Sequence, residues 1–266
     1  MTAVFSRVDG HDLVLTLKEL VKIDSVNPSL VPGGAGEAEI GAFVADFLDG
    51  IGLDVELCEV EKDRPNVVGV LRGKGSAPSL ILNGHVDTVG VEGMVDPFDP
   101  RIDGNRLYGR GSADMKGGLA SILHAVKAVV DSDVELSGDL IVASVVDEEY
   151  ASLGTERLMD SFSADGAVVC EGTGLEIAIA HKGFVWLEVE THGKAAHGSR
   201  PEEGIDAIAK MGRLLVELDD FGVKTLSGRS HRLLGSPSLH ASIISGGREL
   251  STYPDLCRLK LERRTI

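Results

Sequence analysis

The sequence has few cysteines and no long apolar run. Its three cysteines, Cys58, Cys170 and Cys257, are widely spaced and lie in stretches of strand-like composition. This pattern predicts buried thiols rather than disulfides or a cysteine-based metal site. No window approaches the roughly 18 uncharged apolar residues of a membrane-spanning helix, and no basic segment leads into an apolar stretch at the N-terminus. These absences predict a cytoplasmic protein without a membrane anchor.

Positive charge is also scarce. The chain has 26 Lys and Arg against 42 Asp and Glu, a formal net charge of -16 at pH 7. No Lys- or Arg-rich run could follow a phosphate backbone, which argues against nucleic acid as a partner. The sequence also lacks a Gly-x-Gly-x-x-Gly turn after an early strand and a Gly-Lys-Ser/Thr phosphate loop. Nucleotide- and dinucleotide-binding enzymes are therefore disfavoured.

Apolar periodicity divides the chain into two parts that meet near residue 174. Before this point, strand-like stretches alternate with amphipathic ones, which is typical of an α/β sheet. Helices are expected within 11–23, 36–52 and 114–130, and strands within 53–60, 66–73, 79–86, 139–146 and 166–172. The second part is expected to be a separate α+β unit. It would contain paired strands within 176–193, a helix within 202–221, and strands within 238–247 and 255–266.

Histidine and acidic residues lie near the ends of several expected strands. They are His85, Asp87, Asp114, Asp147, Glu148, Glu149 and Glu171. Because α/β sheets place their sites at the carboxyl ends of strands, these side chains are expected to converge. Several acids without a counter-charge would resist burial, whereas an imidazole with carboxylates suits Zn²⁺ and related ions. The sequence therefore predicts a metal site.

Each of these motifs also has an interpretation without function. Residues i and i+2 share a face of an extended chain, so Asp87 can accept a hydrogen bond from the ring nitrogen of His85 that does not bind metal. The same two residues can equally form a satisfied polar pair. Asp114 can simply cap the expected helix that follows it. The acidic run 147–149 can be a solvated loop.

Six motifs together are more informative than any one of them. They are "NGHVDTV", "GRGSADMKGG", "VVDEEYASLGT", "CEGTG", "THGKAAHGSRPEEGIDAI" and "SGGRELSTYPD". With these motifs in family order, nearly the whole chain resembles the M20 family of zinc-dependent peptidases and deacylases. That family includes acetylornithine deacetylase, succinyl-diaminopimelate desuccinylase, aminoacylase and glutamate carboxypeptidase. The resemblance implies a mixed-sheet catalytic, metal-binding domain over residues 1–178 and an α+β lid and dimerisation domain over residues 179–266.

The resemblance also implies which residues hold the cations. A complete site would contain two Zn²⁺ ions, with Co²⁺ or Mn²⁺ as alternatives. Asp114 would bridge both ions, with His85 and Glu171 on the first and Glu149 on the second. Asp87 would orient the metal-bound histidine.

Two more residues receive catalytic roles from the resemblance, which implies hydrolysis of an amide bond in an N-acyl amino acid or small peptide. Glu148 matches the general base that takes a proton from water and returns it to the leaving amine. His197 matches a histidine of the lid that reaches the partner subunit's site in a homodimer and stabilises the oxyanion. Taken without the resemblance, His197 would be interpreted as a residue that stabilises a loop.

The sequence departs from the family pattern at two points. Ser251 stands where the family commonly has asparagine, so the substrate group and the choice between deacylase and exopeptidase stay open. The family also continues beyond the position of Ile266 and supplies there a histidine for the second metal, which has no match here. Both domains are therefore expected to be incomplete. The alternative function is a truncated, non-catalytic chain that binds metal, ligand or a partner, although retention of Glu148 favours an enzyme.

Overall fold

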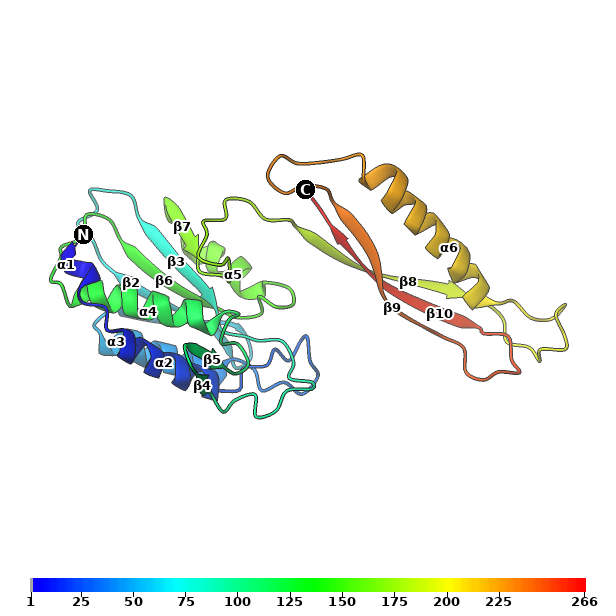
Figure 1. Cartoon of the computed structure of the whole chain (residues 1–266), viewed down its shortest axis with the longest axis horizontal. Helices are drawn as coiled ribbons and strands as arrows, with labels where there is room; N and C mark the ends of the chain where they lie inside the picture. Colours follow the sequence, from blue (N-terminus) through cyan, green and yellow to red (C-terminus); the bar gives the residue numbers. More distant parts are fainter. Residues whose placement is uncertain (1) are drawn as a thin grey trace. The chain divides into compact units, whose positions relative to one another are not determined.

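The computed structural model describes residues 2–266 (Figure 1). Two compact units follow one another along the chain, the first ending at Leu175 and the second running from Glu176 to Ile266. Within the described residues, no helix is long and apolar enough to cross a membrane.

The first unit is built around a mixed five-stranded sheet with the order β1-β2-β6-β3-β7. Its strands are β1 (Asp54–Glu61), β2 (Arg64–Leu71), β3 (Leu80–His85), β6 (Leu140–Val145) and β7 (Gly166–Val169). β3 runs parallel to β6 and β7, whereas β2 pairs antiparallel with β1 and β6. The expected α/β class with a mixed sheet is confirmed.

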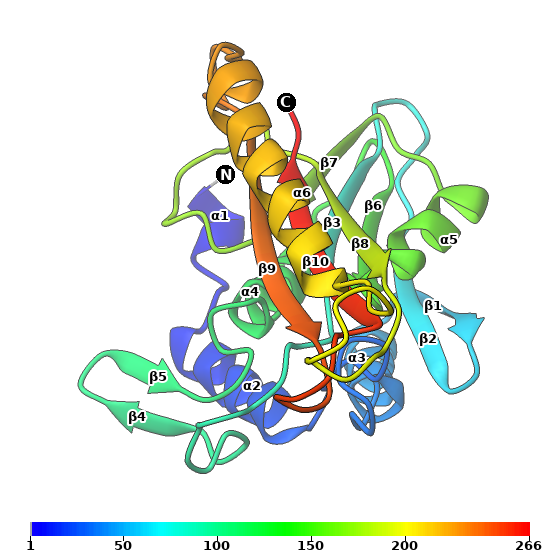
Figure 2. The ribbon, with the colours of Figure 1, turned by 90° about the vertical axis from the view of Figure 1, so that its right-hand side faces the viewer.

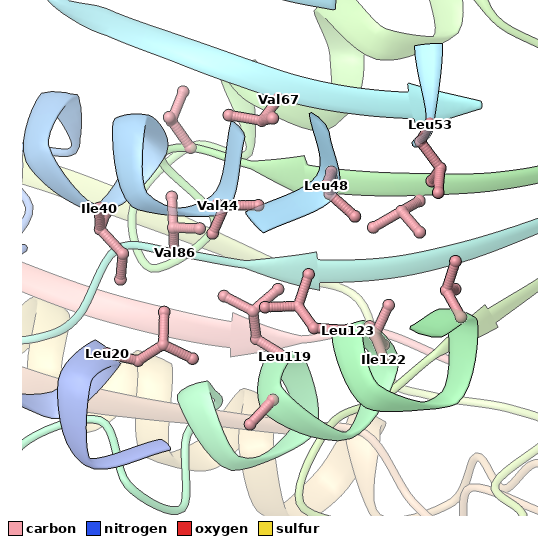
Figure 3. Packing of buried hydrophobic residues seen from close by; sticks show 14 residues of the cluster. Leu20, Ile40, Val44, Leu48, Leu53, Val67, Val86, Leu119, Ile122 and Leu123 are labelled. Atoms are coloured by element: carbon pink, nitrogen blue, oxygen red, sulfur yellow. The ribbon is translucent and has the colours of Figure 1, made fainter. Parts of the chain in front are cut away.

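Helices pack on both faces of this sheet. They are α2 (Gly10–Lys22), α3 (Ala38–Gly50), α4 (Lys116–Val130) and α5 (Leu153–Ser161), whereas the short α1 (Thr2–Phe5) contacts α4. Leu20 of α2, Leu48 of α3 and Leu123 of α4 are fully buried in the larger apolar cluster (Figure 3). Leu158 of α5 packs with Ile141 of β6 on the opposite face. Burial of each such side chain contributes roughly 1.5–3 kcal/mol, and it fixes the helices against the sheet.

The central strand β6 is the most enclosed element of the sheet. Its sequence, LIVASV, is buried from Ile141 to Val145. A strand covered on both faces has this continuous apolar composition, rather than alternating apolar and polar residues. The residues that follow Val145 therefore start from a rigid position.

A short hairpin interrupts the alternation of strands and helices between β3 and α4. It consists of β4 (Arg101–Asp103) and β5 (Arg106–Tyr108), which lie apart from the five-stranded sheet (Figure 2). Periodicity predicted neither this hairpin nor α5. Strands of three residues and a helix of nine residues are too short to give a strong periodic signal.

The second unit is an antiparallel three-stranded sheet with one long helix on it. The order is β8-β10-β9, with β8 at Phe184–His192, β9 at Ser238–Gly246 and β10 at Leu256–Arg264. Helix α6 (Ala207–Phe221) lies along one face of this sheet (Figure 2) and leads into the π-helical turn η1 (Gly222–Leu226). Cys257, Leu259 and Leu261 alternate inward along β10 and pack with Met211 of α6.

Two expectations for the second unit are wrong. Residues 176–193 do not form paired strands, because only β8 is a strand and it pairs with β10. The apolar residues Ile177 and Ile179 are 94% and 78% exposed. The alternation of apolar and polar residues in this segment therefore does not correspond to a strand paired within a sheet. Helix α6 also begins at 207 rather than near 202, because the carboxylate of Asp206 accepts the Ala209 N–H and caps the helix.

The cysteine prediction is correct in part. All three thiols are free, as expected. Cys257 is buried, whereas Cys58 and Cys170 are only half-buried, which corrects the expectation of three buried thiols. Cys58 lies on β1, which is at the edge of the sheet, and Cys170 lies just beyond the end of β7. Positions at the margins of a sheet are covered less completely than positions on its central strands.

Candidate metal centre

Three neighbouring parallel strands end at the same edge of the first unit's sheet. His85 is the last residue of β3 and is paired with Val145, the last residue of β6. Glu148 and Glu149 follow β6, and Glu171 follows β7. The Cys170 N–H donates to the Asn83 carbonyl at 3.1 Å, which continues the pairing of β7 with β3 up to the residue before Glu171. The topology alone therefore brings an imidazole and three carboxylates to one place.

Asp114 reaches the same edge from the segment before α4. The close approach of α4 to the end of β7 depends on Gly118, where a Cβ would lie 2.0 Å from the Cys170 carbonyl oxygen. Glycine is therefore needed for packing at this position, whatever its backbone angles. Met115 is fully buried, and its sulfur lies 3.1 Å from the His85 backbone nitrogen, which connects the start of α4 to the end of β3.

We expect Gly118→Ala to destabilise the first unit by about 1–3 kcal/mol, because the methyl group must push α4 away from the end of β7. The measurement is urea unfolding followed by circular dichroism. Gly212→Ala in α6 is the matched control, since a Cβ there meets nothing within 4 Å and alanine favours a helix by up to about 1 kcal/mol. Equal stability of Gly118→Ala and the wild type would contradict the packing role.

His85 is the centre of the cluster. Its side chain is only 1% exposed, and its Nε2 lies 3.0 Å from Asp114 Oδ1 and 3.5 Å from Glu171 Oε1. His85 belongs to two groups of possible metal ligands, and within each group the ligand atoms lie within 4.8 Å of one another. One contains Glu148 and Glu171, and the other contains Asp114 and Glu149.

The tautomer of His85 follows from its second ring nitrogen. Nδ1 lies 2.9 Å from the backbone carbonyl oxygen of Asp87, and the Asp87 carboxylate is farther away at 3.5 Å. Because a carbonyl oxygen only accepts, Nδ1 carries the hydrogen, and Nε2 of a neutral ring is free to bind a cation. Asp87 thus contacts the His85 ring mainly through its backbone carbonyl, whereas the sequence had suggested its carboxylate.

The carboxylate of Asp87 has a different task. Its two oxygens accept the backbone N–H groups of Glu148 and Glu149, each at 3.1 Å. Burial opposes the charge, but the positive charge of His85 and the hydrogen bonds from Asn27 and the Glu149 N–H hold the pKa of Asp87 below its ordinary value. One buried carboxylate therefore fixes the turn that carries two of the candidate site residues.

The charges at this edge of the sheet favour a bound cation. Burial raises the pKa of Glu149 to about 7, helped by the negative charge of Asp114. Burial also raises the pKa of Glu171. Although burial favours its neutral form, the hydrogen bond to Asp114 and the nearby negative charge of Asp87 raise the pKa of His85 to about 11. The proton of His85 thus balances carboxylates that repel one another, and a divalent cation such as Zn²⁺ bound at Nε2 would supply that positive charge in its place.

The second unit places two sequence motifs side by side. His197 forms an isolated β-bridge with Thr252, and the Gly198 N–H donates to the Ser251 carbonyl at 2.7 Å. The Ser199 N–H donates to Nδ1 of His197 at 3.2 Å, so the hydrogen of a neutral ring is on Nε2. The His197 side chain is exposed and is able to donate from that nitrogen.

Sequence reasoning did not assign a role to a buried polar network behind the centre. Its members are Asn27, Glu37, Arg64 and Asp147. Of these, only Asp147 stands in one of the sequence motifs, directly before Glu148. The other three come from separate elements of the N-terminal third of the chain, and no local spacing connects them.

Comparison with known proteins agrees with this geometry. The sequence pattern of Peptidase family M20/M25/M40 matches residues 81–250, a span that begins in β3 and includes every candidate site residue. The chain is 34% identical over 277 residues to the N-formyl-4-amino-5-aminomethyl-2-methylpyrimidine deformylase of Bacillus subtilis, with 95% of this chain and 63% of that protein covered. It is 31% identical to the acetylornithine deacetylase of Vibrio atlanticus, with 94% of this chain and 67% of that protein covered.

A solved structure shares the fold. The M20 family metallo-carboxypeptidase of Sulfolobus solfataricus superposes with a TM-score of 0.79 at 19% identity, covering 96% of this chain and 71% of that one. The fold and the sequence agree on one class, the M20-type peptidase fold. The chain belongs to peptidase family M20/M25/M40. It spans 63% of the length of its Bacillus relative.

Proposed function

We propose that this protein is a metal-dependent amidohydrolase that removes an acyl group from an N-acyl amino acid or cleaves a small peptide. One observation carries the proposal: His85, Asp114, Glu148, Glu149 and Glu171 converge at the carboxyl end of three parallel strands. The relatives support the reaction class, since a deformylase and a deacetylase both cleave an amide between an acyl group and a nitrogen.

The metal ligands in this proposal are His85, Asp114, Glu149 and Glu171, with Asp114 shared between two positions. The donor set suits Zn²⁺, and Co²⁺ or Mn²⁺ are alternatives with similar ligand preferences. Cations held there would polarise the amide carbonyl and lower the pKa of water. The structure also brings Glu148 within 3.8 Å of His85 Nε2, so this carboxylate lies beside the ligands.

Glu148 performs the proton transfers in this proposal. Its carboxylate takes a proton from the attacking water as the carbon–oxygen bond forms, and gives it to the amine nitrogen as the carbon–nitrogen bond breaks. Glu149, the next residue of the same turn, remains a ligand, as its grouping with His85 and Asp114 allows. Asp87 keeps both residues in place through their N–H groups, so adjacent glutamates can have separate roles.

His197 stabilises the oxyanion in this proposal, acting in the site of a partner subunit in a homodimer formed through the second unit. Support comes from its exposed side chain and from the hydrogen bond that leaves Nε2 as a donor. A neutral imidazole N–H is one of the groups that stabilise negative oxygen in acyl transfer. The backbone pairing with residues 251–253 keeps the His197 loop in a defined shape.

We expect removal of metal to abolish hydrolysis. The purified chain is incubated with N-formyl, N-acetyl and N-succinyl amino acids and with dipeptides, and release of free amine is measured before and after treatment with 1,10-phenanthroline. The account predicts turnover of at least one substrate class, its loss on chelation, and its return on addition of Zn²⁺.

Two results would count against the proposal. Turnover that survives complete metal removal would exclude the metal-dependent mechanism. Stoichiometric metal binding without turnover of any substrate would favour the alternative, a non-catalytic chain that binds metal or a partner.

A further inference from the structure

Arg64, the first residue of β2, lies in a buried ion network behind the metal centre. Its side chain is 7% exposed and that of Glu37 is fully buried. Nε and Nη2 of the arginine each donate to one carboxylate oxygen of Glu37 at 2.7 Å. This two-point geometry uses the planar fork that only arginine offers. Nη1 also donates to Ser29 Oγ and to Glu61, so the guanidinium is firmly held.

The network extends from Arg64 to the turn that carries the candidate base. Nη2 of Arg64 also donates to Asp147 Oδ1 at 3.0 Å. Asn27 Nδ2 donates to the same oxygen at 3.1 Å and to Asp87 Oδ2 at 2.7 Å. Asn27, Asp87 and Asp147 are all fully buried. Arg64 and Asn27 thus connect the two carboxylates on either side of the turn.

Those two carboxylates hold the backbone of the turn. Asp87 accepts the N–H groups of Glu148 and Glu149. The carboxylate of Asp147 accepts the Ala151 N–H through Oδ2 at 3.2 Å. The backbone carbonyl of the same residue accepts the N–H groups of Ala151 and Ser152 at 3.2 and 2.6 Å. Between these anchors, Glu148 and Glu149 are only partly buried, so burial alone does not fix their side chains.

The charges explain why this arrangement depends on Arg64. Three fully buried carboxylates, those of Glu37, Asp87 and Asp147, lie in the network, and Arg64 contacts two of them directly. A buried carboxylate that loses its partner rearranges towards water or other donors. Without Arg64, Asp147 would therefore give up its position and the turn would loosen.

We infer that Arg64 is a positioning residue for the reaction: through Asp147 and Asn27 it fixes the turn that presents Glu148 and Glu149. The role in turnover rests on the proposed function, whereas the fixing of the turn does not. A purely structural ion pair would be complete with Glu37. The additional bond to Asp147, the residue before Glu148, connects this pair to the site.

The experiment compares Arg64→Lys, the double variant Arg64→Met/Glu37→Met and the wild type. Lysine keeps the charge but lacks the fork, and the double variant removes both members of the pair so that Glu37 is not left unpaired. Arg72→Met is the matched control, because Arg72 follows the other end of β2, is 66% exposed and bonds to Asp139. Hydrogen–deuterium exchange of the backbone amides at 146–153 is measured first, and kcat and KM second.

For both Arg64 variants we expect exchange about tenfold faster at 146–153, with the amides of α4 unchanged, and kcat about tenfold lower with KM within twofold. The control should match the wild type in every measurement. Unchanged exchange at 146–153 would overturn the inference. Exchange that rises equally in α4, or loss of folding in both variants, would also overturn it in favour of a general structural role. If the wild type turns nothing over while exchange rises only at 146–153, the proposed function is wrong and the positioning stands.

Discussion

Glu148→Gln should retain its metal and lose most of its turnover. Glutamine has nearly the same shape and keeps the backbone N–H that Asp87 accepts, but it cannot carry a proton from water to the leaving amine. General acid–base catalysis contributes roughly 100- to 10,000-fold, so kcat should fall by this factor. The measurement combines steady-state hydrolysis with zinc content per chain.

Glu217→Gln is the control for this variant, since Glu217 is an exposed glutamate on α6 of the second unit. It should leave both zinc content and turnover unchanged. An unchanged rate in Glu148→Gln would show that another group moves the proton. Loss of zinc in Glu148→Gln would instead make Glu148 a ligand, as its grouping with His85 and Glu171 in the structure allows.

Asp114→Ala should lose metal binding. Asp114 Oδ1 lies 3.0 Å from His85 Nε2, and the residue joins His85 and Glu149 in one of the two candidate ligand groups. Its removal takes away one ligand and one negative charge, so we expect Zn²⁺ affinity to fall more than about 100-fold. Equilibrium dialysis followed by metal analysis measures the change.

Two comparisons make this result specific. Asp103→Ala removes an exposed carboxylate from the β4–β5 hairpin and should leave zinc affinity as in the wild type. Asp114→Asn keeps the size of the side chain and should bind zinc more weakly than the wild type. Equal zinc content in Asp114→Ala and the wild type would remove Asp114 from the centre.

Much of this architecture was accessible from the sequence, because its signals are local. Strands β3 and β6 are short apolar runs that end in polar residues, and the rule that α/β sites lie at carboxyl ends predicted their convergence. His85 and Glu149 come together as that rule expects. The register of parallel strands alone places them there.

The features that the sequence did not disclose depend on distant contacts. Arg64 and Asp147 are 83 positions apart, and no pattern in either segment indicates that they are paired. The hydrogen bond from His85 to the Asp87 carbonyl, in place of its carboxylate, depends on how the backbone turns after β3. Residues 176–183 show the converse error, since alternating apolar residues there suggested a strand for which the fold supplies no partner.

The most direct test of the account is a crystal structure of the zinc-loaded chain with anomalous data collected at the zinc edge. The account predicts a peak at the carboxyl end of β3, about 2.0–2.2 Å from His85 Nε2 and from a carboxylate oxygen of Asp114. A folded chain with no anomalous peak at this position, or with zinc only at other residues, would contradict it.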